Sequence, residues 1–191
     1  MEVDGNSKKE PIDVLALFPE VRSIKDANLR DAVIATWQEL WSMSQWVRVQ
    51  DVPTGPEVPY PTIPHNQAVI AMSLAIADVF ESVHGVTVDR DCLVAAAVLQ
   101  DASKPIEYAP SANGGFSIAP LGRMYPHGFW AAHVALKHGI PDSVVHILLT
   151  HASQSPTFPE SLEGKILYYA DQLDVIAIHK DRWRKQIFIS K

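Results

Sequence analysis

Histidines and aspartates recur along this chain at positions that could together hold a metal ion. His65 comes first, the run Gln100-Asp101-Ala102-Ser103-Lys104 follows, and His127, His151 and Asp171 come later. Imidazole nitrogens and carboxylate oxygens are ligands that divalent cations such as zinc, manganese, iron and nickel accept. These residues lie on or beside segments rich in apolar side chains, so we expect them to point inward. The pattern therefore predicts a buried metal site to which several helices contribute.

The composition is that of an ordinary globular protein. The chain has 191 residues, of which 47% are hydrophobic and 20% charged, which is enough for one domain with a substantial core. The net charge is −6 and the sequence holds no basic stripe, so we expect neither a nucleic acid nor a membrane as partner. Cys92 is the only cysteine, which excludes an internal disulfide and a cysteine-rich zinc site.

The sequence predicts neither a signal peptide nor a membrane-spanning segment. The first residues, MEVDGNSKKEPID, are polar, and no stretch approaches the roughly 18 uncharged apolar residues of a membrane span. We therefore expect a cytoplasmic enzyme or a small-molecule-binding domain, and a homo-oligomer is compatible with this class.

Apolar residues at helical spacing predict helices along most of the chain. Between Asp26, the expected N-cap, and Val47, six of them recur at helical intervals: Leu29, Val33, Ile34, Trp37, Leu40 and Trp41. His65 opens a second helix, whose apolar face continues through Val69, Met72, Ile76 and Val79. Residues 92–99 are apolar on all sides, as in a helix at the centre of a bundle, and Pro105 marks the end of that helix.

Three more helices are expected in the second half of the chain. One begins at about His127 and stops at Gly139, and the next runs from Pro141 to His151. The last carries Asp171 on a stripe beside its apolar face, which consists of Leu162, Ile166, Ala170, Leu173 and Ala177.

Other segments should lack regular helix. We expect residues 1–12 to be a mobile tail, and residues 51–64, with five prolines, to be an extended connector that wraps the domain. Residues 106–125 could hold a short hairpin around Gly114-Gly115. The prediction is a single all-α domain over residues 13–191.

Taken in order, these segments resemble the HD-domain superfamily of metal-dependent hydrolases. The family pattern is a histidine, a buried His-Asp pair with lysine three residues later, and a distal aspartate, and many members add two histidines between. The matching segments are HNQAV (65–69), LVAAAVLQDASK (93–104), PHGFWAAHVALKHGIP (126–141), VVHILLTHA (144–152) and YYADQLD (168–174). The resemblance covers about residues 60–175, and FPEVRSIKDANLRDAV (18–33) is similar to a leader helix of some members. It implies a bundle of about five core helices plus an N-terminal helix.

The resemblance also implies roles for the residues. The metal ligands would be His65, Asp101, His127, His151 and Asp171, holding one or two ions of zinc, manganese, iron or nickel. Asp101 would anchor the metal and could bridge two ions. Lys104 would stabilise negative charge that develops during the reaction. Asp174, one turn after Asp171, competes with it for the role of ligand.

Gln100 departs from the family pattern, because it stands where the family has the histidine of its namesake pair. An amide oxygen can ligate a metal but is a poorer donor than imidazole. Two interpretations are open. Either Gln100 is a natural variant with an altered or weaker metal site, or it is a substitution made to silence the enzyme. We place it with Asp101 and Lys104 among the catalytic residues.

A second group of residues could contact the substrate because it lies close to His127 in the sequence. It consists of Arg123, Tyr125, Trp130 and His133. Arg123 and Tyr125 precede His127 in a loop, Trp130 could form a wall of the pocket, and His133 could line it.

Three functions are compatible with the pattern. The first is a hydrolase that acts on a small molecule, such as a phosphate ester or an amide, through a metal-activated water. The second is a di-iron oxygenase, which some relatives with two additional histidines are. The third is a non-catalytic domain that binds a small molecule at a degenerate site. Metal content and oxygen uptake would distinguish the three.

Overall fold

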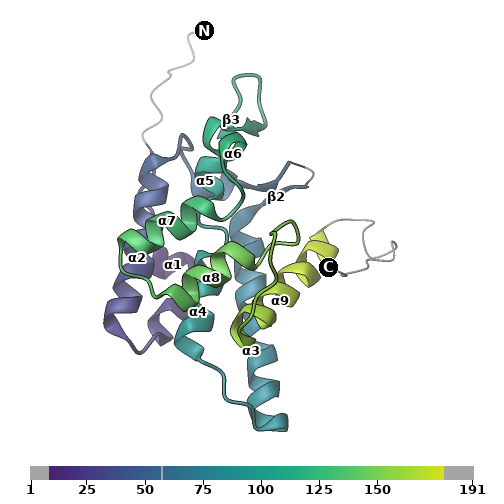
Figure 1. Cartoon of the computed structure of the whole chain (residues 1–191). Coiled ribbons are helices and arrows are strands. Elements are labelled where there is room, and N and C mark those ends of the chain that lie inside the picture. Colours follow the sequence, from purple (N-terminus) through teal and green to yellow (C-terminus); the bar gives the residue numbers. More distant parts are fainter. Residues whose placement is uncertain (1–8, 57, 179–191) are drawn as a thin grey trace.

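The computed structural model describes residues 9–56 and 58–178, and their fold is all-α, as predicted (Figure 1). The principal helices are α2 (Ala27–Met43), α3 (Thr62–His84), α4 (Arg90–Leu99), α7 (Phe129–Lys137), α8 (Asp142–Thr150) and α9 (Leu162–Ile178). The short helices are α1 (Val14–Leu17), η1 (Pro19–Ser23), η2 (Val49–Asp51), α5 (Lys104–Glu107) and α6 (Pro120–Met124). The strands are β1 (Pro53–Gly55), β2 (Val58–Pro61), β3 (Tyr108–Pro110) and β4 (Phe116–Ile118).

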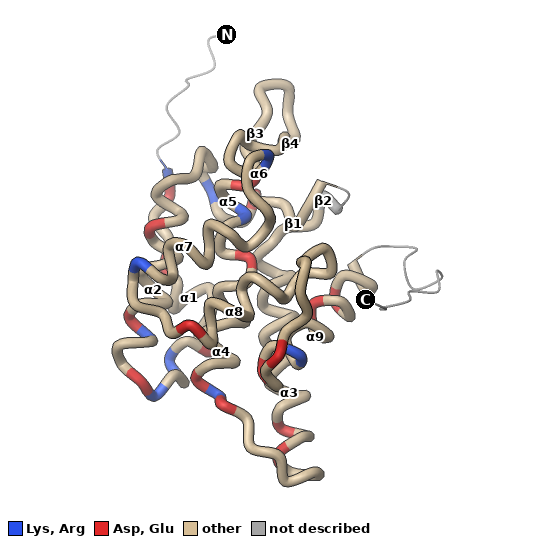
Figure 2. The backbone as a smooth tube through the Cα atoms, in the orientation of Figure 1, with Lys and Arg blue, Asp and Glu red and all other residues tan. Residues whose placement is uncertain are grey.

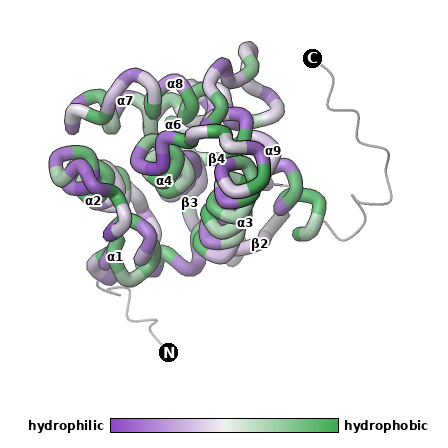
Figure 3. Tube along the Cα trace, turned by 90° about the horizontal axis from the view of Figure 1, so that it is seen from below, coloured by the Kyte–Doolittle hydropathy of each residue, from purple (hydrophilic) through white to green (hydrophobic). Residues whose placement is uncertain are grey.

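Helix α4 is the centre of the bundle. All of its residues from Cys92 to Leu99 are buried, which fits a segment that is apolar on every side. It packs against α2, α3, α8 and α9, and Figure 3 shows it between α2 and the α3–α9 pair. Trp37 of α2 donates a hydrogen bond from Nε1 to the carbonyl oxygen of Val98, 2.9 Å away. The end of α4, where Asp101 follows, is therefore fixed from several directions.

Local signals set the ends of several helices, although α4 ends at Leu99, before the predicted end at Pro105. The side chain of Asp26 accepts hydrogen bonds from the first turn of α2, and Asp89 does the same for α4. Gly139 follows α7 with a φ of 80°, a conformation that glycine adopts without strain. Two helices begin elsewhere than expected, because α3 starts at Thr62 rather than at His65 and α7 starts at Phe129 rather than at His127.

The proline-rich segment and the second hairpin fold as small antiparallel pairs. Strands β1 and β2 pair within residues 51–64, so this connector turns back on itself instead of running extended around the domain. Strands β3 and β4 pair in the predicted hairpin. Both pairs extend from the same end of the bundle (Figure 1).

Residues 9–12 are held against the bundle, unlike the mobile tail that the sequence predicted for this part of the chain. The ammonium group of Lys9 donates hydrogen bonds to the carbonyl oxygens of Trp41 and Ser44. The backbone N–H of Glu10 donates to the carbonyl oxygen of Val47. Residues 1–8, the rest of the predicted tail, lie outside the described residues, as do residues 179–191 at the end of the predicted domain.

By length and composition alone α3 could cross a membrane, which corrects the expectation that no stretch would qualify. A single such helix is weak evidence of a membrane span, and one face of α3 packs inside the bundle. His65, Asn66 and Ser73 are polar and buried along its inner face, which packs against α4 and α9. In the described part of the chain, lysines and arginines are scattered among several elements rather than gathered into a basic tract (Figure 2).

Candidate metal centre

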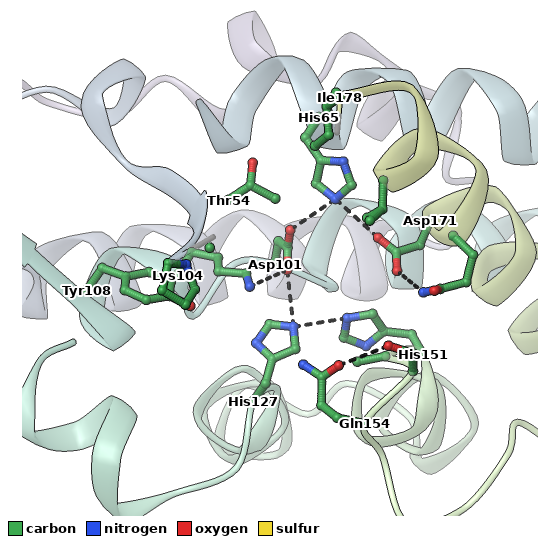
Figure 4. A pocket seen from close by; sticks show the side chains of 16 residues that line it. Thr54, His65, Asp101, Lys104, Tyr108, His127, His151, Gln154, Asp171 and Ile178 are labelled. Carbon is green, nitrogen blue, oxygen red and sulfur yellow. Dashed lines mark hydrogen bonds and ion pairs between the residues drawn. The ribbon is translucent and has the colours of Figure 1, made fainter. Parts of the chain in front are cut away.

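Asp101 lies at the middle of the site, immediately after the buried helix α4. Its side chain is almost completely buried. One carboxylate oxygen, Oδ2, lies 3.4 Å from Nε2 of His65, and the other, Oδ1, lies 3.2 Å from Nε2 of His127. Figure 4 shows Asp101 between these two rings. Its two oxygens therefore face histidines that come from opposite sides of the cavity.

On one side of Asp101, helices α3 and α9 bring together His65, Asp171 and Asp174. Nε2 of His65 lies 3.1 Å from Oδ1 of Asp171. The other ring nitrogen, Nδ1, donates a hydrogen bond of 2.6 Å to Asp174. By its spacing from Asp171, Asp174 is a rival ligand, but it lies behind the ring of His65, on the nitrogen that faces away from Asp101.

On the other side, His127 and His151 face each other. Their Nε2 atoms are 3.2 Å apart, and together with Asp101 they form a group of ligand atoms that all lie within 4.8 Å of one another. His151 donates from Nδ1 to the carbonyl oxygen of Leu148 at 2.9 Å. His127 donates from Nδ1 to Glu107, whose two carboxylate oxygens lie 2.9 and 3.1 Å away. Each Nδ1 therefore has an acceptor of its own.

Gly128 makes this close approach of the two histidines possible. Its φ is 82°, and a methyl group on its Cα would overlap the carbonyl oxygen of Leu148. This carbonyl group is the one that holds His151. Glycine is thus required between His127 and α7 for two reasons: the positive φ strains other residues, and there is no room for a side chain.

Lys104 supplies a positive charge beside Asp101. Its ammonium nitrogen lies 3.7 Å from Oδ1 of Asp101, and the side chain lines the cavity next to the ring of Tyr108. Burial alone would lower the pKa of Lys104, but the charges of Asp101 and Glu107 raise it well above its ordinary value. Lys104 therefore stays charged at any physiological pH.

The same carboxylates shift the pKa values of the histidines. Burial would lower the pKa of His65, but hydrogen bonds to Asp171 and Asp174, with the charge of Asp101, raise it to about 10. Burial also opposes the charge on His127, yet Glu107 and Asp101 raise its pKa to about 9.

His151 behaves differently from the other two rings. Its burial, and then the charge of the neighbouring His127, lower its pKa to about 4. The ring is therefore neutral at pH 7: its Nδ1–H donates to the carbonyl oxygen of Leu148, and its Nε2 carries a lone pair that faces Nε2 of His127.

The cavity at these groups has a volume of about 300 Å³. It is lined by His65, Asp101, His127, His151 and Asp171, with Lys104 beside them. The β1 end contributes Thr54, Gly55 and Pro56, and Tyr108 comes from β3. The remaining wall consists of Ala152, Ser153, Gln154, Gln172, Val175 and Ile178. Among these lining residues Lys104 is the only lysine or arginine, and outside the histidines and aspartates the polar side chains carry no formal charge: Thr54, Tyr108, Ser153, Gln154 and Gln172.

The structure does not bring the second predicted group into this cavity. Arg123, Tyr125, Trp130 and His133 are absent from the described lining residues. The rings of Tyr125 and Phe129 stack with centroids 4.6 Å apart, and Trp130 meets both edge-on. His133 lies at the other end of the same aromatic group, and Arg123 donates to the carbonyl oxygen of Ile118. Tyr125, Trp130 and His133 therefore pack with Phe129 at the start of α7 rather than around the candidate site.

Gln100 is fully buried, but it does not line the cavity. Neither its amide oxygen nor its amide nitrogen has a hydrogen-bond partner among the described residues. A buried amide without partners costs stability, so such groups are rare in folded proteins. The structure thus places Gln100 beside Asp101 in the chain with two unsatisfied polar atoms.

Glu107 and Asp174 support the site from behind, and Glu107 was missed by the sequence analysis. Burial opposes the charge of Glu107, but His127 lowers its pKa to about 2, so it is a carboxylate at neutral pH. The one sequence feature that could have indicated Glu107 is Ser103, four residues earlier. Its hydroxyl donates a hydrogen bond of 2.6 Å to Glu107. This spacing alone does not separate a buried carboxylate from an exposed one.

The donor set fits a divalent cation. When Nδ1 of each histidine carries the proton that it donates, all three Nε2 atoms present lone pairs toward Asp101, Asp171 or each other. Acceptor atoms that converge in this way at about 3 Å repel one another unless a cation or a proton lies among them. The raised pKa values of His65 and His127 have the same cause, because the surrounding carboxylates stabilise a positive charge at these rings. Imidazole and carboxylate ligands suit zinc, manganese, iron or nickel.

Comparison with known proteins agrees with this geometry. Residues 63–176 match the HD domain. The dihydroneopterin 2′,3′-cyclic phosphate phosphodiesterase of Methanocaldococcus jannaschii is 36% identical over 113 residues, which is 59% of this chain and 45% of that protein. The chain thus spans about half the length of the curated relative it matches. No solved structure is significantly similar to it. Because the matched segment includes every histidine and aspartate of the cavity, we conclude that the chain belongs to the HD domain family.

Proposed function

We propose that the protein is a metal-dependent hydrolase that acts on a small phosphate ester, most specifically a phosphodiester. The observation that supports this proposal best is the convergence of three Nε2 atoms and two aspartates on one cavity, each ring being held by a partner at Nδ1. His65, Asp101, His127, His151 and Asp171 would hold one or two divalent ions. When bound, a divalent ion lowers the pKa of water toward neutrality and polarises the phosphorus–oxygen bond.

The residues around the ligands have separate tasks. Lys104 holds a permanent positive charge 3.7 Å from Asp101, where it can pair with a phosphate oxygen and stabilise the charge that develops there. Gln172 donates a 2.8 Å hydrogen bond to Oδ2 of Asp171 and so leaves Oδ1 toward His65. The buried position of the ligands excludes bulk water from all but the open side of the cavity.

The wall of the cavity favours a substrate with little negative charge. Lys104 is the only lysine or arginine among its described lining residues, and this charge already faces Asp101. A triphosphate would bring more negative charge than this wall can balance, whereas a phosphodiester carries a single one. The named activity of the archaeal relative is that of a phosphodiesterase acting on a cyclic phosphate, which supports the same class. We place the protein in the cytoplasm, where a small phosphorylated metabolite is available.

The test is the hydrolysis of bis(p-nitrophenyl) phosphate and of nucleoside 2′,3′-cyclic phosphates by protein loaded with manganese, iron, zinc or nickel. Asp101→Asn should lower turnover more than about 100-fold, because the loss of an outer contact to a metal ligand already costs 10- to 100-fold. Asp78→Asn is the matched control, since Asp78 is a carboxylate paired with Arg90 away from the cavity. Turnover that survives in Asp101→Asn, or oxygen uptake in place of hydrolysis, would refute the proposal.

A further inference from the structure

Glu107 is a buried carboxylate whose contacts are all made inside the protein. It lies at the end of α5 and is only 7% exposed. Both carboxylate oxygens accept from Nδ1 of His127, at 2.9 and 3.1 Å, and Oε1 also accepts from the hydroxyl of Ser103 at 2.6 Å. The contacts form a chain from Ser103 through Glu107 to His127.

Core packing does not account for this carboxylate. A buried charge costs several kcal/mol unless it is paired and hydrogen-bonded. Among the described residues the only ion pair of Glu107 is with His127, and neither a lysine nor an arginine lies within pairing distance. An apolar side chain at this position would avoid the cost of burial. What Glu107 provides, and an apolar residue would not, is a directed acceptor for one ring nitrogen.

The backbone of Glu107 is held as firmly as its side chain. Its carbonyl oxygen accepts from the N–H of Ala119 at 2.8 Å. Gly122 of α6 packs so closely on this carbonyl group that a methyl group on the glycine would overlap it. The carboxylate therefore stands at a fixed distance from His127.

We propose that Glu107 is a positioning residue that fixes the tautomer and the orientation of His127 for metal binding. With its proton on Nδ1 and directed at Glu107, the ring presents the lone pair of Nε2 to the space beside Oδ1 of Asp101 and Nε2 of His151, each 3.2 Å away. A histidine needs such a free lone pair to ligate a metal. This inference rests on the metal-dependent function proposed above.

Ser103 extends the same arrangement by one contact. Its hydroxyl lies in the turn between Asp101 and Lys104 and donates to Glu107. Segment 101–107 thus contains Asp101 at the centre of the site and Lys104 with its ammonium group. It also contains Glu107, which supports His127.

The experiment measures the affinity of the metal-free full-length protein for Mn²⁺ and Zn²⁺ by isothermal titration calorimetry. Glu107→Gln keeps the shape of the side chain but replaces the carboxylate by an amide, so we expect binding 10- to 100-fold weaker than in the wild type. The control is Glu39→Gln, because Glu39 also accepts from a histidine, His138 at 2.9 Å, but outside the cavity. It should leave metal affinity unchanged.

Two further variants separate positioning from a general loss of structure. Ser103→Ala keeps the charge of Glu107 and removes one hydrogen bond, so metal affinity should fall by about fivefold, as expected for roughly 1 kcal/mol. In a His127→Ala background, Glu107→Gln should cause no further loss of affinity, because the ring through which it acts is gone. A merely structural glutamate would weaken binding equally in both backgrounds.

The outcomes also distinguish this inference from the proposed function. If Glu107→Gln and Ser103→Ala bind metal like the wild type and the wild type hydrolyses phosphodiesters, the positioning role is wrong and the proposed function stands. If the wild type binds neither metal, both are wrong. If the losses from Glu107→Gln are equal with and without His127, the positioning role is overturned.

Discussion

His127 and His151 face each other across 3.2 Å, yet their pKa values move in opposite directions. The Nδ1 of His127 meets a carboxylate, whereas that of His151 meets a backbone carbonyl. At pH 7 one ring therefore binds a second proton and its neighbour does not. Only one proton can lie between the two Nε2 atoms, and a metal ion would displace it. Metal binding should therefore release protons.

Gln100→Met should stabilise the metal-free protein by about 1–3 kcal/mol. The substitution preserves volume and removes a fully buried amide that has no partner among the described residues. Urea unfolding of the metal-free protein measures the change. Gln67→Met is the control, because Gln67 already donates to the carbonyl oxygen of Leu17, and it should give no stabilisation. A destabilised Gln100→Met protein would show that the amide has partners in solution.

Gln100→His tests whether glutamine is a natural variation of the site. Gln100 does not line the cavity, so the histidine form can tighten binding only by turning its ring toward Asp101; we then expect Mn²⁺ or Zn²⁺ to bind about tenfold more tightly, because imidazole is the better donor. Its turnover need not rise, since the cavity is formed without the side chain at position 100. Metal affinity and turnover of the two forms are measured side by side. An inactive glutamine protein that histidine restores by orders of magnitude would instead indicate a silencing substitution.

The sequence was sufficient to predict which candidate ligands lie together, but not which residues support them. His65, Asp101, His127, His151 and Asp171 were found because their order along apolar segments follows a family pattern. Glu107 follows no such pattern, since its role depends on the direction in which His127 enters from a distant segment. The predicted substrate residues near His127 failed to reach the cavity for a similar reason. The turn at Gly128 directs α7 and its aromatic residues away from it.

At the level of elements, the site depends on a close contact between two backbone segments, the turn before α7 and the end of α8. Gly128 separates His127 from α7 and lies against the carbonyl group that holds His151. The helices that carry the ligands were predictable from apolar spacing. The two hairpins were less so, because proline-rich and glycine-rich segments specify turns locally while their pairing depends on the rest of the fold.

Gly128→Ala should weaken metal binding at least tenfold and destabilise the protein by more than about 2 kcal/mol. Alanine at a positive φ is strained, and its methyl group would push Leu148 and with it His151. Gly139→Ala is the matched control, because Gly139 has a similar φ of 80° but nothing within 4 Å of the added methyl group. It should cost about 1 kcal/mol and leave metal affinity intact. Equal metal affinities in the two variants would contradict a special role of Gly128.

For the molecule as a whole, the buried histidines predict how stability depends on pH. In the metal-free protein the pKa values of His65 and His127 are about 10 and about 9, above the value of roughly 6.5 in an unfolded chain. The stabilisation from their protons is complete below about pH 6.5 and is lost as the pH rises toward 10. The Tm of chelator-treated protein should therefore fall between pH 6.5 and 10.

Over the same pH range, the stabilisation of the protein by added metal should increase. Because metal and protons compete for the same nitrogens, the increase of Tm on adding Zn²⁺ or Mn²⁺ should grow from pH 6.5 to 9. Scanning calorimetry with and without chelator measures both trends. A Tm of the metal-free protein that stays constant or rises over this range would show that His65 and His127 are not protonated in the folded state.

The proposed ligands come from α3, the end of α4, the segment before α7, the end of α8, and α9. During synthesis, a ribosome has to release the chain beyond Asp171 and Asp174 before His65 can meet these two carboxylates of α9. A fragment that ends after His151 already carries Asp101, His127 and His151, whose ligand atoms lie within 4.8 Å of one another in the folded protein. In the proposed metal enzyme, a protease that removed α9 would therefore separate His65 from Asp171 and Asp174 and leave the other three residues in place.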